Sequence, residues 1–293
     1  MEKTNKTKIG IFFIRGIIAL SVLAVALIVL LLLRNSEAVC EFFAVTVARF
    51  WITLFGGLFA NISFSIFELF IAIIVIAVVV LLVLMIVGLV KKQYRRVLSG
   101  ALVVALFGVS FGVLYTVTAG MTYNREEVDI AIYSEKQSNE LKYDDVKNIA
   151  EYFVNELNVI GARLPRKVDG SVDCPYTFAE LNALLIEEYA KLDSAYYNSF
   201  TPTAKVIVNK SIMSQMHIVG VFFAPTGEAN INPNEGDYRL PFSMAHEMAH
   251  GKGVMRENDA NLVALNIVLR SNNDYLRYSG LMDAYGSLVS AVS

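Results

Sequence analysis

Three long apolar runs dominate the first 120 residues of the chain. Residues 11–33, 69–90 and 97–118 are each long enough to cross about 30 Å of hydrocarbon as a helix. The first run is much longer than the apolar core of a signal peptide, and no small-residue cleavage site follows it. We therefore expect three retained transmembrane helices in a membrane domain that covers residues 1–120.

The connector between the first two runs, about residues 40–60, mixes aromatic side chains with charges such as Glu41 and Arg49. This pattern predicts an amphipathic helix that lies in the membrane interface and ends near Gly56. A fourth crossing would conflict with the topology that the charges indicate, so we expect none.

After residue 120 the pattern becomes that of a globular domain, residues 121–293. Apolar residues at helical spacing predict helices, and runs rich in Val, Ile and Phe predict strands. Thr177 and Glu180 have the spacing of a capping box. Helices, then a small sheet, then helices again indicate an α+β fold. The expected helices cover residues 144–159, 177–192, 242–251, 258–269 and 281–292, and the expected strands cover residues 205–208 and 217–223.

Charge predicts which side of the membrane each part faces. Residues 1–120 carry ten Lys and Arg against four Asp and Glu, whereas residues 121–293 carry 15 against 23. Basic residues in short loops stay on the cytoplasmic side. They gather before the first run and in the turn between the second and third: Lys3, Lys6, Lys8, Lys91, Lys92, Arg95 and Arg96. We therefore expect a cytoplasmic N-terminus and a C-terminal domain outside the cytoplasmic membrane.

The acidic outer domain argues against nucleic acid as a partner, whereas the apolar runs predict the lipid bilayer as one. Both cysteines, Cys40 and Cys174, fall on the outer side, where a disulfide is possible. They do not have the spacing of a metal-binding pair. The sequence leaves their pairing open.

Most of the chemistry is indicated by His246-Glu247-Met248-Ala249-His250, an HExxH motif on an expected helix. Residues four positions apart lie on the same face of a helix, so both imidazoles can point at one Zn²⁺. Glu247 lies about 100° round the helix, which suits a general base better than a ligand. The alternative is a helix whose two histidines are only packed or solvated.

A catalytic zinc requires a third protein ligand, and Glu257 is the best candidate. The glycines after the motif can end the first helix with a left-handed turn, so that the chain reverses into a second helix. Asn261, one turn after Glu257, could orient a ligand histidine. Asp259 points elsewhere, and Arg256 stands where an HExxHxxGxxH motif has its third histidine. The alternative for Glu257 is a carboxylate that only favours the helix dipole.

These residues predict hydrolysis of a peptide bond by a zinc-activated water, with Glu247 as the general base. A further donor to the oxyanion is usual in such sites. Tyr278, after the second helix, is the tentative choice, and His217, Tyr275 and Arg277 are the other candidates.

An extended substrate needs a strand edge beside the metal, and residues 218–223 could provide one by β-augmentation. Glu228 and Asn230, which follow this strand, are tentative contacts to the substrate. Both residues would also suit a turn that has no functional role.

The pairing of HExxH with a Glu-x-x-Ala-Asn helix resembles the gluzincins, which include membrane CAAX-processing and heat-shock metallopeptidases. This resemblance covers about residues 240–270. Most of the chain also resembles a bacterial family of membrane proteins that is classed as a domain of unknown function and presumed to contain zinc peptidases. The segments that carry this second resemblance are residues 64–68, 122–125, 226–232, 256–261 and 277–280. Members of that family tend to continue beyond the position of Ser293.

The two resemblances imply a zincin-like fold, with His246, His250 and Glu257 as zinc ligands and Glu247 as the base. We therefore expect a membrane-anchored zinc metallopeptidase that acts on extracytoplasmic or membrane-proximal substrates. The alternative is a non-catalytic zinc-binding sensor or scaffold that binds peptides or partner proteins, which would not need Glu247. Intramembrane proteolysis is disfavoured because charges flank the motif: Asp237, Arg239, Lys252 and Arg256.

Overall fold

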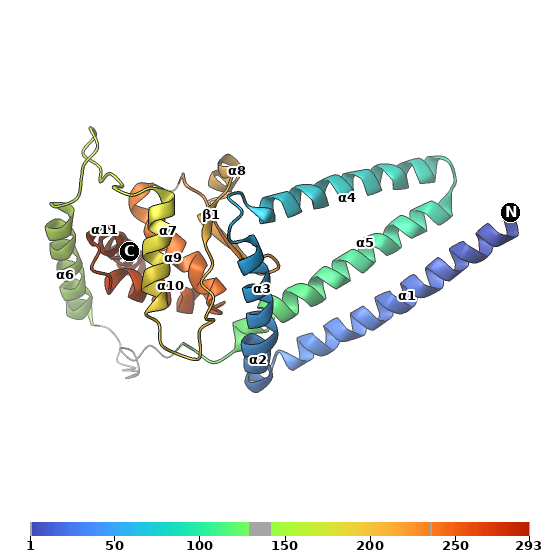
Figure 1. The fold of residues 1–293 in the computed structure, drawn as a ribbon, viewed down its shortest axis with the longest axis horizontal. Helices are drawn as coiled ribbons and strands as arrows, with labels where there is room; N and C mark the ends of the chain where they lie inside the picture. The colour runs from blue at the N-terminus through green and yellow to red at the C-terminus, as the bar shows by residue number, and fades with distance from the viewer. Residues whose placement is uncertain (1, 129–141, 235, 293) are drawn as a thin grey trace. The chain divides into compact units, whose positions relative to one another are not determined.

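Most of the chain is helical, and its sheet has three short strands (Figure 1). The computed structural model describes residues 2–128, 142–234 and 236–292. The chain divides into two units. The first contains Met1–Ala48 and Ile66–Arg125, and the second contains Arg49–Ser65 and Glu126–Ser293.

The first unit consists of apolar helices and the short turns next to them. Helix α5 (Tyr94–Tyr115) packs against both α1 (Glu2–Leu33) and α4 (Ile66–Val90). The buried Arg125 forms a bidentate ion pair with Glu41, with nitrogen–oxygen distances of 2.6 and 2.9 Å. The other elements are α2 (Glu37–Phe43), the π-helical turns η1 (Ala44–Ala48) and η2 (Thr116–Gly120), and the 3-10 turn η3 (Thr122–Asn124).

Several helical segments are suited to a membrane. Among the described residues, four are long and apolar enough to cross one: Ile11–Leu33, Glu37–Phe59, Ile66–Val90 and Tyr94–Asn124. The first, third and fourth confirm that the three long apolar runs form helices. The second, which we expected to lie in the interface, meets the same criterion of length and hydropathy. These segments indicate that the protein associates with a membrane.

The helices of the second unit agree with the pattern of apolar residues. Thr177 caps its helix as predicted, because its hydroxyl accepts a hydrogen bond from the N–H of Glu180 and its own N–H donates to the Glu180 carboxylate at 2.7 Å. Four helices confirm the predicted ones: α6 (Tyr143–Gly161), α7 (Phe178–Ala190), α9 (Leu240–Gly251) and α10 (Glu257–Leu269). Helix α11 (Asp274–Val292) begins earlier than predicted, and the short α8 (Lys210–Gln215) was not predicted.

The three strands lie in the order β1-β3-β2. Strand β1 (Ala204–Val206) runs parallel to β3 (Glu228–Ile231), and β2 (Gly220–Phe223) runs antiparallel to it. Strands β1 and β2 confirm two predictions, whereas the central β3 was missed because its polar Glu228 and Asn230 indicated a turn. Strand β2 lies at the side of the sheet, so one of its edges is not paired with a strand in the part of the chain that the structure describes.

The core of the second unit lies where the sheet and helices α7, α10 and α11 pack around α9. Met244 and Met248 of α9 are fully buried there. The buried hydroxyl of Tyr189 on α7 donates a hydrogen bond of 2.5 Å to the carbonyl of Ala245. These contacts hold one face of α9 in the core, while the face that carries His246 is only partly buried.

Helix α3 (Arg49–Phe59) belongs to the second unit and packs on its loops. The indole N–H of Trp51 donates to the carbonyl of Pro225 at 3.0 Å, and the Arg49 guanidinium donates to Asn198 at 3.1 Å. The predicted membrane domain, residues 1–120, therefore does not include Arg49–Ser65, which belongs to the second unit. These partners lie about 150 or more positions further along the chain, where the sequence pattern of the segment itself gives no sign of them.

Both cysteines are free. The buried Cys40 thiol lies 3.3 Å from the carbonyl oxygen of Arg34, and the Cys174 thiol lies 3.1 Å from that of Tyr176. The disulfide that the sequence left open is not formed in the structure.

Candidate metal site and cleft

Helix α9 presents the two histidines of the motif to the same side. Their ring centroids are 4.8 Å apart and the ring planes are nearly perpendicular, at 88°. The helix ends at Gly251, and Gly253 then adopts a φ of +95°, a left-handed conformation that side chains disfavour. This turn reverses the chain, so that Glu257 at the first position of α10 returns to the face of α9 that carries both rings.

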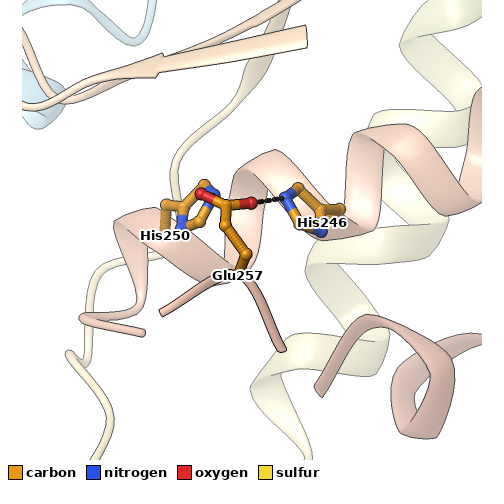
Figure 2. A group of neighbouring side chains, drawn as sticks. All are labelled: His246, His250 and Glu257. Carbon is orange, nitrogen blue, oxygen red and sulfur yellow. Dashed lines mark hydrogen bonds and ion pairs between the residues drawn. The ribbon is translucent and has the colours of Figure 1, made fainter. Parts of the chain in front are cut away.

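The reversal brings three donor groups together, as predicted from the sequence. Figure 2 shows the Glu257 carboxylate in front of both imidazoles. Its two oxygens lie 3.2 Å from Nε2 of His246 and 3.7 Å from Nε2 of His250. One donor atom from each residue lies within 4.8 Å of the others, so the three residues could hold a metal ion.

The second nitrogen of each imidazole has its own partner. Nδ1 of His246 lies 2.8 Å from Oδ1 of Asn261, and Nδ1 of His250 lies 2.7 Å from the carbonyl oxygen of Val254. Because both partners are acceptors, they favour the tautomer in which Nδ1 carries the proton. In that tautomer the lone pairs of both Nε2 atoms point toward the Glu257 carboxylate, and a divalent cation bound there would replace the hydrogen bond that joins Nε2 of His246 to Glu257.

Burial and neighbouring charges shift the pKa values of these groups in different directions. Burial lowers the pKa of His250 to about 4, with help from His246, so this imidazole stays neutral near pH 7. Burial also lowers the pKa of His246, but the carboxylates of Glu257 and Glu247 outweigh it and leave that pKa raised. The hydrogen bond with His246 lowers the pKa of Glu257. Glu257 therefore supplies an anionic oxygen and His250 a neutral nitrogen, the forms in which they bind metal.

Glu247 lies between α9 and the edge strand β2. Its side chain is 7% exposed, and burial raises its pKa to about 7, opposed by His246 and by a hydrogen bond from the backbone N–H of Phe222. A cation held by the three donors would lower this pKa again. Gly220 makes room for the carboxylate, since a Cβ at that position would lie 2.6 Å from both Cγ and Oε1 of Glu247.

The site opens into a cleft of about 350 Å³. One wall comes from the loop and edge strand before β3, the floor from α9, and the rest from α10 and α11. The lining residues are His217, Ile218, Val219, Gly220, Arg239, Phe242, Ser243, His246, Glu247, Asn261 and Asp283. Arg239, Ser243 and Asp283 were not predicted as site residues, because no motif includes them and Asp283 reaches the cleft only through the packing of α11.

Of the candidate oxyanion donors, only His217 lines the cleft, and its φ of +55° is left-handed. Tyr278 does not line the cleft, because its ring lies against Gly161 of α6. Tyr275 donates its hydroxyl to the carbonyl of Asp237, and Arg277 pairs with Glu156. The tentative choice of Tyr278 is therefore wrong for this arrangement: α11 begins at Asp274 and turns that ring toward α6.

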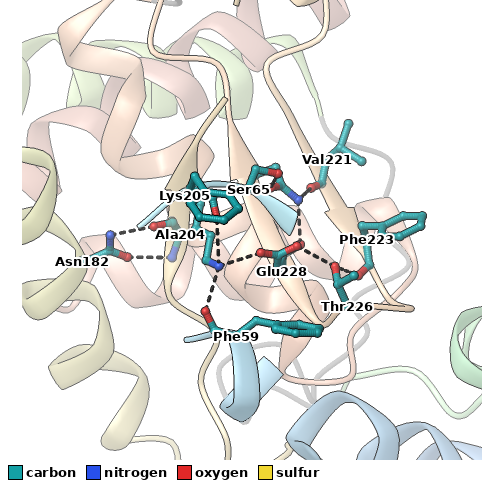
Figure 3. A network of polar contacts seen from close by, with 11 residues as sticks. Phe59, Ser65, Asn182, Ala204, Lys205, Val221, Phe223, Thr226 and Glu228 are labelled. Carbon is teal, nitrogen blue, oxygen red and sulfur yellow. Dashed lines mark hydrogen bonds and ion pairs between the residues drawn. The ribbon is translucent and has the colours of Figure 1, made fainter. Parts of the chain in front are cut away.

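Glu228 and Asn230 do not line the cleft and are buried in a polar network, in which Figure 3 shows Glu228 with Lys205 and Thr226. Glu228 forms an ion pair of 2.6 Å with Lys205 and accepts a hydrogen bond of 2.7 Å from Thr226. Asn230 accepts a bond of 2.7 Å from the Ser65 hydroxyl. Their exposed fractions are 2% and 0%, which corrects the expectation that they contact a substrate.

Comparison with known proteins identifies the family but adds no function. The chain matches the description "Protein of unknown function (DUF3810)" over residues 43–293. It belongs to this family. Neither a search of curated proteins nor one of solved structures found a significant match. The matched residues of the DUF3810 family include α9, α10 and the whole cleft, so the site lies within the part of the chain that defines the family.

Proposed function

We propose that the protein is a membrane-anchored, zinc-dependent metallopeptidase that hydrolyses peptide bonds of extracytoplasmic or membrane-proximal substrates. The observation behind this proposal is that His246, His250 and Glu257 lie close enough together to hold one metal ion, while His246 and the buried Glu247 line the same cleft. A metal-binding scaffold needs the three donors. It does not need a carboxylate that is kept out of the donor set and buried against the edge strand.

The donor set fits zinc. Two imidazole nitrogens and one carboxylate are a common set for catalytic zinc, which leaves a further coordination position open. Asn261 and the Val254 carbonyl hold both rings in the required tautomer. When bound, zinc supplies Lewis acidity, which lowers the pKa of a water molecule and polarises a carbonyl group.

The residues around Glu247 support a role in proton transfer. Its carboxylate is held by the Phe222 N–H and by the close approach of Gly220, and it faces the same cleft as His246. From there it can accept a proton from the attacking water and pass it to the leaving amine. The edge of β2 that has no strand neighbour among the described residues lies beside it, and an extended peptide can add to such an edge by backbone hydrogen bonds.

We further propose three membrane spans, with the N-terminus in the cytoplasm and the catalytic domain outside the cytoplasmic membrane. The basic residues around the first span and in the turn between α4 and α5 support this orientation. The contacts of α3 with the second unit support an interfacial position for this helix. Ile52 on the packed side is 1% exposed, whereas Phe50, Leu54 and Leu58 on the other side are exposed and uncharged.

The function is tested by metal content and cleavage, measured on the full-length protein in detergent. We expect one zinc per wild-type chain, loss of zinc in His246→Ala and Glu257→Ala, and retention of zinc without cleavage in Glu247→Ala. Glu187→Ala, which removes an exposed carboxylate on α7, is the matched control and should behave as wild type. Cleavage by Glu247→Ala would contradict the mechanism. Zinc binding by a wild type that cleaves no peptide would favour the non-catalytic sensor or scaffold.

The orientation is tested by labelling intact cells with a maleimide that does not cross membranes. Val168, which is fully exposed in the second unit, and Lys91, in the turn after α4, are each replaced by Cys in a chain without its own cysteines. We expect labelling at Val168→Cys only. Labelling at Lys91→Cys in intact cells would reverse the proposed orientation.

A further inference from the structure

Arg239 is the one Lys or Arg side chain among the described residues that line the cleft, and it stands on a turn that is held from several sides. Arg239 ends the 3-10 turn η5 (Asp237–Arg239) and leads directly into α9. The carbonyl of Asp237 accepts a hydrogen bond of 2.6 Å from Tyr275, and its carboxylate pairs with Lys167. These contacts fix the backbone of the turn, while the Arg239 side chain remains exposed at the cleft.

Ser243 lies one helical turn further along the same face of α9, and it also lines the cleft. Among the residues that the structure describes, neither the Arg239 guanidinium nor the Ser243 hydroxyl has a hydrogen bond or an ion pair. Asp283 of α11 also lines the cleft, where it is close enough to feel the charges of both Arg239 and His246, and it forms no ion pair with Arg239 in the part of the chain that the structure describes. The Arg239 guanidinium lies 5.8 Å from the ring centroid of Tyr238, and its hydrogen-bond donors and the Ser243 hydroxyl face the space that a substrate would occupy.

The distance from Arg239 to His246 determines how many substrate residues fit between a group bound at Arg239 and the bond that is cleaved. His246 follows Arg239 by seven positions, which corresponds to about 10 Å along a helix. An extended peptide covers about 3.4 Å per residue, so about three residues span this distance. A group held by Arg239 would then lie within about three residues of a bond positioned at His246 and Glu247.

We propose that Arg239 and Ser243 form a subsite for a carboxylate of the peptide substrate, either its C-terminal carboxylate or an Asp or Glu side chain. The planar guanidinium matches a carboxylate with two parallel hydrogen bonds, and the serine hydroxyl adds a third donor. Asp283 competes for the same guanidinium and weakens the subsite. This inference rests on the proposed peptidase function, and it narrows the substrates to peptides with a carboxylate within about three residues of the cleaved bond.

The experiment uses zinc-loaded full-length protein in detergent and an equimolar peptide library, prepared once with free and once with amidated C-termini. Mass spectrometry of the products gives the ratio of kcat/KM for peptides with and without a nearby carboxylate. We expect Arg239→Ala to lower this ratio about tenfold, Arg239→Lys to restore part of it, and Asp283→Asn to raise it. Lys210→Ala, which removes an exposed cation outside the cleft, should leave the ratio unchanged.

The two libraries distinguish the source of the carboxylate. A preference that disappears on amidation identifies the C-terminal carboxylate, whereas a preference for Asp and Glu over Asn and Gln that survives amidation identifies a side chain. The same ratio in wild type and Arg239→Ala would overturn the subsite.

A second measurement keeps the subsite testable if the wild type cuts no peptide, a result that would count against the proposed function alone. A fluorescent Glu-rich hexapeptide and its Gln counterpart are titrated against zinc-loaded Glu247→Ala. We expect tighter binding of the Glu peptide, and loss of this difference when Arg239→Ala is added. Equal Kd values for the two peptides would overturn the subsite.

Discussion

Replacement of Lys205 by Met should loosen the segment that joins α3 to α4 from the sheet of the second unit. Lys205 on β1 is 4% exposed, and its ammonium group contacts only oxygens. It lies 2.6 Å from Glu228, 2.9 Å from the carbonyl of Phe59 and 3.3 Å from the carbonyl of Phe64 (Figure 3). The two carbonyls bracket the loop between α3 and α4, so one side chain holds both ends of that loop against the sheet.

The expected loss of stability in Lys205→Met follows from the buried charge that the substitution leaves behind. Met keeps the apolar stem of Lys205 but leaves the buried Glu228 carboxylate without its ammonium partner, while the Thr226 hydroxyl still donates to it at 2.7 Å. Removing one partner of a buried ion pair costs about 3–5 kcal/mol. For a domain of this size, that corresponds to a fall in Tm of about 10 °C. The double variant Lys205→Met/Glu228→Gln also removes the buried negative charge and should recover more than half of the loss.

The chain contains one tryptophan, Trp51, and it lies on α3 with its indole N–H bonded to Pro225. Its emission therefore reports whether α3 is packed on the second unit. We expect Lys205→Met to shift this emission to longer wavelength and to make residues 60–65 sensitive to protease. Lys210→Met, which changes an exposed lysine, is the control. A Tm within about 2 °C of wild type with unchanged Trp51 emission would refute the reasoning.

Three further predictions concern the site and its surroundings. Gly220→Ala places a Cβ 2.6 Å from Glu247 and must displace that carboxylate by nearly 1 Å, so kcat should fall about 100-fold while zinc content stays the same. Asn261→Ala removes the acceptor of His246 and should weaken zinc binding about 10- to 100-fold, as measured by competition with a chelator. Burial, with help from Arg49, lowers the pKa of Lys252 to about 8. The unfolded chain therefore binds more protons between pH 8 and about 10.4, and wild-type stability should rise over this range relative to Lys252→Met, by about 2–3 kcal/mol.

Each of these expectations has an outcome that contradicts it. Full activity in Gly220→Ala would mean that Glu247 needs no fixed position. Unchanged zinc affinity in Asn261→Ala, with Asn258→Ala as the control on the same helix, would show that His246 is oriented by other contacts. Parallel stability curves for wild type and Lys252→Met from pH 7 to 10.5 would show that the buried ammonium carries no penalty.

The sequence could predict the site where the relevant spacing is short. His246 and His250 share a face because they are four positions apart, and Glu257 returns to them because a glycine turn joins two helices. Asn261 follows by the same helical spacing. In each case the geometry depends on backbone conformations within about 15 residues, which local periodicity and turn chemistry describe well.

The long apolar runs were predictable for a related reason, since hydropathy and length alone make a helix suitable for a bilayer. The prediction from sequence was wrong for two polar residues that are buried. Glu228 and Asn230 looked like turn or substrate-binding residues, yet they form the central strand, because Lys205, Thr226 and Ser65 satisfy their polar groups.

Only the tertiary structure decided which distant segments meet. It assigned Arg49–Ser65 to the second unit, turned Tyr278 toward α6, and brought Asp283 of α11 to the same cleft as Arg239. The motif and the spans follow from chemistry that a short window of sequence contains. A buried polar partner or a wall of a cleft depends on contacts between residues far apart in the chain, and the free energy of those contacts is set by packing that no local pattern encodes.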